Sequence, residues 1–176
     1  MASSASFLPG TLQTDNGELV DTAAALSGKV VALYFSAHWC PPCRGFTPKL
    51  AAAYEMANED EELFQVVFVS SDDGEKEMCD YMVAMHGPWL CIPYDDPARN
   101  KLKQAYGCFG AKEQPNWPEV ARRSGIPALV VVGPDGTELD FEAVDTVTAK
   151  GPGAVAEWAT KFKWPASSAP APGADN

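Results

Sequence analysis

Residues 30–44 have the sequence VVALYFSAHWCPPCR, and this stretch decides the fold. Residues 30–35 are apolar, with β-branched and aromatic side chains, which is typical of a buried strand. Beyond the stretch, apolar residues recur at the spacing of one helix face, at Phe46, Leu50, Ala53, Tyr54 and Ala57. The two cysteines of the motif, Cys40 and Cys43, therefore lie where a strand leads into the N-terminus of a helix.

This position suits redox chemistry. Two thiols separated by two residues can close a small disulfide ring and open it again without moving the rest of the chain. Free backbone N–H groups and the helix dipole favour an anion at a helix N-terminus, and a thiolate is such an anion. Pro41 and Pro42 suit the first helical turn, where their missing N–H groups cost little. The motif therefore predicts a redox-active dithiol.

The same cysteine spacing also occurs in half of a zinc site, so this alternative has to be weighed. A structural zinc ion needs four nitrogen or sulfur ligands. Cys79, Cys91 and Cys108 are scattered along the chain, and His38 and His86 stand alone. We therefore expect no bound metal. We expect no cofactor either, because the sequence has no Gly-rich nucleotide loop.

The composition indicates one globular domain with a hydrophobic core, since 46% of the 176 residues are hydrophobic and 21% are charged. The net charge of −11 argues against nucleic-acid binding, which requires a basic patch. No apolar stretch approaches the ~20 residues of a membrane helix. Residues 1–14 contain no Lys or Arg, which argues against a secretory signal. We expect a cytoplasmic protein, with the nucleus also open to so small a chain.

Turn signals and apolar runs predict the other strands. A hairpin is expected over residues 11–20, with Asp15-Asn16-Gly17 at its turn. Residues 64–70 are a second apolar run of the kind found in parallel sheets. A further buried strand over residues 128–132 is expected to return over residues 137–141 as a hairpin.

Apolar residues at helical spacing predict three further helices. Their inward-facing residues are Met78, Tyr81, Met82 and Met85 in the first, Ala98, Leu102, Ala105 and Tyr106 in the second, and Val155, Trp158, Ala159 and Phe162 in the third. Asp72 or Asp73 is expected to cap the first of these helices. Alternating strands and helices followed by an antiparallel pair imply an α/β fold, with a mixed central sheet and helices on both faces.

The ends and one internal segment depart from this pattern. We expect a flexible N-terminus over residues 1–10, a folded domain over residues 11–165 and a disordered Ala-, Pro- and Ser-rich tail over residues 166–176. Residues 108–124, called the insertion below, are long for a loop in a compact domain, so they are either functional or disordered. Cys108 within them is either a third redox thiol or a passive buried one.

Together these pieces resemble the thioredoxin superfamily and, within it, the nucleoredoxins and tryparedoxins. The matching residues are Tyr34–Arg44, Phe46-Thr47-Pro48, Val67–Ser70 with Asp72, Pro88-Trp89-Leu90 with Ile92-Pro93-Tyr94, Gly125-Ile126-Pro127 and Pro134-Asp135-Gly136. The resemblance as a whole spans roughly residues 19–165, most of the chain. Tryparedoxins carry a Trp before their Asp, whereas this chain has Ser71 before Asp72, which favours the nucleoredoxin side.

The resemblance implies a thioredoxin-like, three-layer α/β/α domain and assigns roles to its residues. Cys40 would be the attacking nucleophile, and Cys43 would resolve the mixed disulfide. Pro127 would be a cis-proline facing the dithiol. The implied substrate groove consists of the residues around the dithiol, namely Trp39, Pro41, Pro42, Ile126 and Pro127. One departure concerns proton transfer: thioredoxins bury an acid where this chain has Tyr34, so the proton must be handled by water or another group.

The resemblance implies a thiol-disulfide oxidoreductase that reduces protein disulfides, of the nucleoredoxin type. Its partners would be disulfide-containing proteins and an electron donor, either a thioredoxin-reductase-type enzyme or a low-molecular-weight thiol. The alternative is a redox-sensitive protein-binding module of the same fold without significant turnover. Because the insertion ends just before Gly125-Ile126-Pro127, we expect it to influence the choice of partner.

Overall fold

A computed structural model describes residues 7–166 of the chain. Its middle layer is a seven-stranded mixed sheet with the strand order β2-β1-β5-β4-β3-β6-β7. The strands are β1 (Thr11–Gln13), β2 (Leu19–Asp21), β3 (Val30–Ser36), β4 (Phe64–Ser70), β5 (Leu90–Cys91), β6 (Ala128–Val132) and β7 (Glu138–Asp140). The helices are α1 (Thr22–Leu26), α2 (Pro41–Ala57), α3 (Glu75–Met85), α4 (Ala98–Tyr106), α5 (Ala143–Lys150) and α6 (Pro152–Ala159), with a 3-10 helix at Ala111–Asn116.

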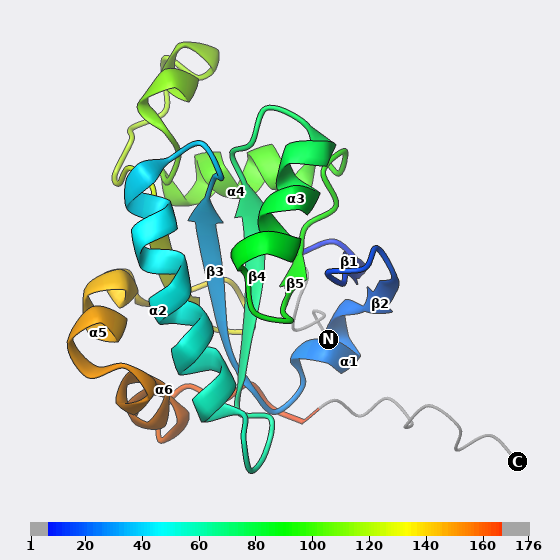
Figure 1. Ribbon diagram of the computed structural model, residues 1–176, viewed down its shortest axis with the longest axis vertical. Coiled ribbons are helices and arrows are strands. Elements are labelled where there is room, and N and C mark those ends of the chain that lie inside the picture. Colours follow the sequence, from blue (N-terminus) through cyan, green and yellow to red (C-terminus); the bar gives the residue numbers. More distant parts are fainter. Residues whose placement is uncertain (1–6, 167–176) are drawn as a thin grey trace, which may run out of the picture.

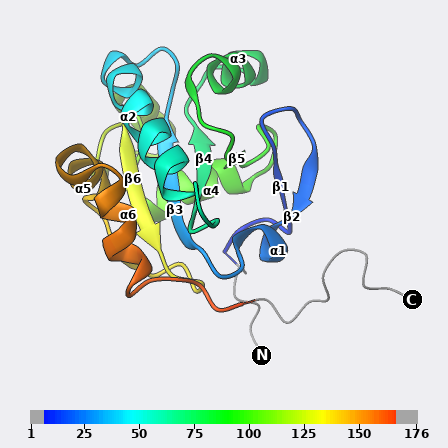
Figure 2. The same ribbon diagram turned by 60° about the horizontal axis from the view of Figure 1, so that its bottom comes forward.

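The two central strands are buried along their whole length. All residues of β3 and β4 are buried, because helices cover both faces of the sheet. Alternate residues of β3 therefore enter two cores. Tyr34 packs with residues of α2, α3, α5 and α6 on one face, and Phe35 packs with residues of α1 and α4 on the other. Figures 1 and 2 show this layered arrangement, which confirms the predicted α/β fold.

Most predicted elements form where the sequence indicated. The expected hairpin is the antiparallel pair of β1 and β2, and the apolar runs became β3, β4 and β6. Four elements were not predicted: α1, β5, α5 and the 3-10 helix. Each is too short or too polar on one face to give a clear period; α5, for example, buries only Ala143 and Val147.

Helix α4 also differs in its buried face. Ala105, which we expected to face inward, is exposed, whereas Lys103 is 1% exposed. The lysine is buried because its ammonium group pairs with Glu113 of the insertion, 2.7 Å away. A charged residue thus takes an inward position because a segment distant in sequence supplies its partner.

The N-terminal segment is packed from residue 7 onward. Leu8 is buried, and the ring centroid of Phe7 lies 6.3 Å from that of Trp164. The remaining part of the expected flexible N-terminus, residues 1–6, and the expected tail from residue 167 onward lie outside the described residues. Within residues 7–166, none of the helices is long and apolar enough to cross a membrane.

His86, just after α3, occupies an apolar aromatic site. Its ring centroid lies 4.5 Å from Phe68, 4.3 Å from Tyr81 and 5.0 Å from Trp89. The indole N–H of Trp89 donates to His86 Nδ1 at 3.0 Å, while Nε2 is buried without a partner among the described residues. Burial lowers the pKa of His86 to about 3, so the fold holds a neutral imidazole.

This site predicts a specific acid sensitivity. Unfolded His86 takes up a proton near its ordinary pKa of 6.5, but folded His86 does so only near 3, so acidification between these values favours unfolding. The variant His86→Gln keeps an acceptor for Trp89 and does not titrate. We expect its unfolding free energy to fall less than that of the wild type between about pH 7 and about pH 4.5, measured with urea. Equal losses in both proteins would contradict the assignment.

Candidate active site

The two motif cysteines lie together at the N-terminus of α2. Cys40 is the N-cap residue, and Cys43 lies in the first turn. The Cys43 thiol donates to the Cys40 sulfur across 2.7 Å. Cys40 retains 5% exposure, whereas Cys43 is fully buried. Cys40 is thus the sulfur nearer to solvent, and the Cys43 thiol is its hydrogen-bond donor.

Burial makes Cys43 the harder thiol to ionise. It raises the pKa of Cys43 to about 12, and the neighbouring Ser36 hydroxyl and Ala37 backbone act in the opposite direction. The sulfur of Cys43 therefore faces a hydroxyl group on the strand that precedes the motif. No sequence pattern singled out Ser36, because a serine inside an apolar strand gives no periodic signal.

Ile126 and Pro127 reach the dithiol through the pairing of β6 with β3. These strands are antiparallel, and Phe35 at the end of β3 pairs with Ala128 at the start of β6. The residues just before β6 therefore lie beside Cys40. The Ile126 carbonyl accepts a hydrogen bond from Cys40 Sγ at 3.6 Å, and the Ile126–Pro127 peptide bond is cis.

Trp39 forms the other side of the site. Its indole N–H donates to the Ser71 carbonyl at 2.9 Å, which ties it to the loop after β4. The Lys112 ammonium of the insertion lies 3.9 Å from the centroid of the same ring. A Cβ atom built on Gly110 would lie 3.0 Å from the ring edge. Trp39, at 37% exposure, is thus in contact with the insertion, whereas Pro41 and Pro42 are simply exposed.

Asp72 is a site residue whose role the sequence did not indicate. We expected Asp72 or Asp73 to cap α3, and this was wrong: the N-cap is Gly74, with no side-chain hydrogen bond. Asp72 instead accepts from the His38 backbone N–H at 2.7 Å and from the Ser70 hydroxyl at 2.8 Å. The parallel register of β3 and β4 brings these loops together. Burial raises the pKa of Asp72, and these two hydrogen bonds oppose the increase.

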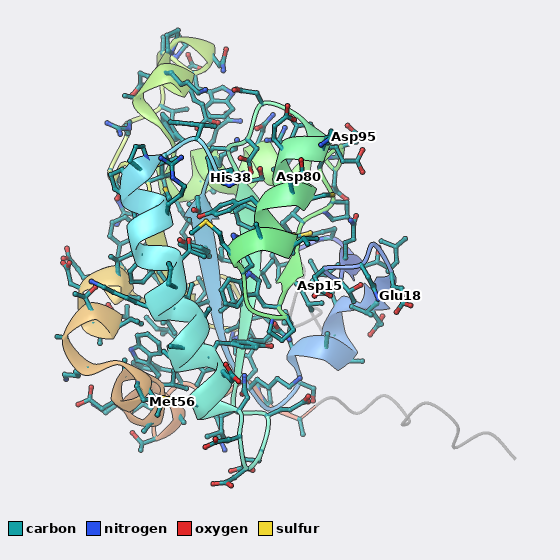
Figure 3. All side chains as sticks on the ribbon, in the orientation of Figure 1. Asp15, Glu18, His38, Met56, Asp80 and Asp95 are labelled. Atoms are coloured by element: carbon teal, nitrogen blue, oxygen red, sulfur yellow. The ribbon has the colours of Figure 1, made fainter. Side chains whose placement is uncertain are left out.

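His38 connects this loop to the neighbouring helices. Its ring stacks on that of Tyr81, with centroids 5.0 Å apart and planes inclined by 6°. The Arg44 guanidinium donates to the His38 carbonyl at 2.7 Å. Figure 3 shows His38 between the N-terminal end of α2 and α3. Contacts with α3 and with α2 therefore hold His38, the residue before Trp39, in place.

The insertion is structured and lies at the same end of the domain as the dithiol. In Figure 1 it is the yellow-green segment that projects beyond the C-terminal end of β3. Glu113 holds it in place: one carboxylate oxygen binds Lys103, and the other accepts from Ser71 Oγ at 2.7 Å and from the Gly110 N–H at 2.8 Å. An isolated parallel β-bridge between Cys108 and Ser124 joins the two ends of the insertion.

The other cysteines differ from the motif pair. Cys91 and Cys108 are fully buried, and burial raises the pKa of each to about 12, which is typical of passive thiols. Cys79 is half-buried on α3. Among residues 7–166, no group of three or more His, Cys, Asp or Glu side chains is placed to hold a metal ion.

The role of Asp72 can be tested by substitution. Asp72→Ala leaves the His38 N–H without its acceptor, which we expect to cost about 1–3 kcal/mol of unfolding free energy and to slow alkylation of Cys40. Asp72→Asn keeps one acceptor oxygen and should have a smaller effect on both. Urea unfolding and iodoacetamide kinetics measure these quantities. Wild-type alkylation kinetics in Asp72→Ala would show that the loop does not depend on this carboxylate.

Comparison with known proteins places this site in a family. Residues 28–138 match the family model described as thioredoxin-like. The chain is 39% identical to probable nucleoredoxin 1 of Arabidopsis thaliana over 126 residues, covering 72% of the chain and 19% of that protein. It is 36% identical to tryparedoxin of Trypanosoma brucei brucei over 168 residues, covering 94% of the chain and 99% of that protein.

A solved structure agrees with these matches. Tryparedoxin II complexed with glutathionylspermidine superimposes with a TM-score of 0.66 at 27% identity, over 91% of this chain and 96% of that one. The chain spans about a fifth of the plant nucleoredoxin and nearly the whole of the tryparedoxin. From the fold, the paired cysteines and these matches together, the chain belongs to the thioredoxin-like family, among the nucleoredoxins and tryparedoxins.

Proposed function

We propose that this protein is a thiol-disulfide oxidoreductase that reduces protein disulfides through the Cys40–Cys43 dithiol. The observation that carries the proposal is the hydrogen bond from Cys43 to Cys40 at a helix N-terminus, beside the Ile126 carbonyl. This arrangement stabilises a Cys40 thiolate and holds the second thiol within reach. It also leaves a backbone carbonyl near the position that a substrate disulfide would occupy.

The reaction follows from this geometry in two exchanges. The Cys40 thiolate attacks one sulfur of the substrate disulfide, and the other substrate sulfur leaves as a thiolate that takes up a proton. Cys43 then attacks the Cys40 sulfur, and the first substrate sulfur leaves in the same way. The substrate gains two electrons and two protons, and Cys40 and Cys43 end as a disulfide.

An external donor must then reduce the protein disulfide again. We propose either a thioredoxin-reductase-type enzyme or a low-molecular-weight thiol. The complex of tryparedoxin II with glutathionylspermidine supports the second class by analogy. We also propose a cytoplasmic location, because Cys79, Cys91 and Cys108 are free thiols, as is usual in a reducing compartment.

The substrate groove belongs to the same proposal. Ile126 and Pro127 supply one wall, and Trp39 with the exposed Pro41 and Pro42 supplies the other. Backbone groups beside Ile126 can pair with an extended substrate chain whose sulfur meets Cys40. Ile126 is already in van der Waals contact with the cluster of Ala37, Cys40 and Cys43, which supports this placement.

The competing function is a binding module whose cysteines only switch its affinity. Insulin reduction with dithiothreitol as the electron donor separates the two. We expect the wild type to catalyse repeated turnover and Cys40→Ser to be inactive, whereas Cys43→Ser, reduced beforehand and freed of dithiothreitol, should stop at a stable mixed disulfide on Cys40. Mass spectrometry identifies the adduct, and Cys79→Ser is the matched control that should keep full activity. Stoichiometric binding of insulin without turnover would support the module instead.

The insertion should determine which proteins are reduced. Lys112 both covers Trp39 and pairs with Asp73 at 3.1 Å, so this segment borders the face that a substrate must approach. We propose replacing residues 110–123 with a two-residue link in a Cys43→Ser background. Lys103→Met must accompany the deletion, because an unpaired buried lysine would cost about 3–5 kcal/mol.

We expect the shortened protein to react normally with a small model disulfide and to trap a different set of proteins from a lysate. The point variant Lys112→Ala, which leaves the fold of the insertion intact, should shift the set in the same direction but less. Comparison of the trapped proteins by mass spectrometry gives the readout. An unchanged set with the shortened protein would remove the insertion from substrate recognition.

A further inference from the structure

Four buried hydroxyl groups form a hydrogen-bonded chain beside Cys43. Ser36 Oγ lies 2.7 Å from the Tyr81 hydroxyl, which lies 2.5 Å from Thr47 Oγ1. The Tyr34 hydroxyl lies 2.7 Å from the same Thr47 oxygen, which donates to the Cys43 carbonyl at 2.8 Å. All four side chains belong to residues with 0% exposure, so the chain is shielded from solvent.

The protons of these four hydroxyl groups can be arranged in two ways, named here the first and the second setting. Each hydroxyl has one proton and can also accept. In the first setting, Tyr34 and Tyr81 both donate to Thr47, and Ser36 donates to Tyr81, so Ser36 presents a lone pair to the Cys43 sulfur. In the second, Tyr81 donates to Ser36, and Ser36 donates to the sulfur. Thr47 keeps Tyr34 as a donor in both.

The change between the settings requires two O–H groups to rotate. The Tyr81 and Thr47 oxygens, 2.5 Å apart while a proton lies between them, must also move apart slightly, but no buried hydroxyl loses its last partner. Tyr34 is therefore important although it does not touch the sulfur, because it satisfies Thr47 when Tyr81 turns away. Tyr34 stands at the position where, by the family resemblance, thioredoxins bury an acid.

The second exchange of the proposed reaction requires a hydrogen-bond donor to Cys43. Once Cys40 is bonded to the substrate, Cys43 loses its hydrogen-bond acceptor and must become a thiolate in a buried site. Burial raises its pKa to about 12, so the ionised form needs a donor.

The groups packed around Cys43 include no competing acid. Cys40 and the Ala37 N–H face it from the start of α2 and the loop before it, and Ser36 and Tyr34 from β3. Tyr81 faces it from α3, where its ring contacts the rings of His38 and of the neutral His86. The carboxylate of Asp72 accepts from the His38 N–H. A hydroxyl is thus the side chain available to donate to Cys43 in this part of the described structure.

We propose that Ser36 is a catalytic residue of the resolving step, in which it is the hydrogen-bond donor to the Cys43 thiolate. Tyr81, Thr47 and Tyr34 are positioning residues that allow the O–H group of Ser36 to rotate toward the sulfur. The inference rests on the proposed function. As the Cys43 sulfur bonds to Cys40, the bond between Cys40 and the substrate sulfur breaks. The departing thiolate takes up a proton, which replaces the one that Cys43 released, and no further reductant is consumed.

The two exchanges can be timed separately with dithiobis(nitrobenzoate) in stopped flow. Attack by Cys40 releases one coloured thiolate, and attack by Cys43 on the mixed disulfide releases the second. The half-buried Cys79 is replaced by Ser throughout, so that it does not react. In Ser36→Ala we expect an unchanged first phase and a second phase slowed by about tenfold or more near neutral pH. The pH profile of the second phase should shift to higher pH.

Tyr81→Phe serves as an independent variant because it keeps the ring packing and removes one member of the chain. It should slow the second phase less than Ser36→Ala does. Tyr54→Phe, which removes another buried tyrosine hydroxyl outside the chain, should change neither phase. A second phase in Ser36→Ala with wild-type rate and pH profile would overturn the proposal, as would equal slowing of both phases. Wild-type protein that never releases the second thiolate would instead refute the reductase function itself.

Discussion

The pairing of β3 with its two neighbours is the constraint on which the rest of the site depends. Parallel β4 ends at the same edge as β3, so the loop carrying Asp72 meets the loop carrying His38. Antiparallel β6 begins at that edge, so Ile126 meets Cys40. One strand thus aligns Cys40, the groups that fix its loop and the carbonyl beside it. Burial of β3 on both faces keeps this alignment rigid.

The sequence predicted those parts that depend on local signals. The apolar run before the motif and the helical spacing after it are enough to place Cys40 and Cys43 at a strand–helix junction. The position of Ile126 came from the family resemblance alone, because strand pairing over such a distance leaves no local pattern. The same limit explains why Asp72 was expected to cap α3, which it does not. Its partner, the His38 N–H, belongs to a different loop.

Two buried polar features show a second limit of sequence reasoning. Ser36, Thr47 and Tyr81 come from β3, α2 and α3, and only the folded chain brings their hydroxyls together. The burial of Lys103 could not be predicted from its own helix, because a charged side chain is normally exposed. Its partner, Glu113, lies in the insertion. The hydroxyl chain lies beside Cys43, and the Lys103–Glu113 pair holds the insertion near the dithiol. A shared fold can therefore support different proton handling and different partners.

The central claim is that Cys40 and Cys43 form one two-electron couple while the other thiols remain passive. The most direct test equilibrates the protein with graded mixtures of reduced and oxidised glutathione and maps all five cysteines by differential alkylation and mass spectrometry. We expect Cys40 and Cys43 to become protected together in a single transition as an intramolecular disulfide, with Cys79, Cys91 and Cys108 still alkylated once the protein is denatured. Separate transitions for the two motif cysteines, or a stable disulfide from either of them to another cysteine, would contradict it.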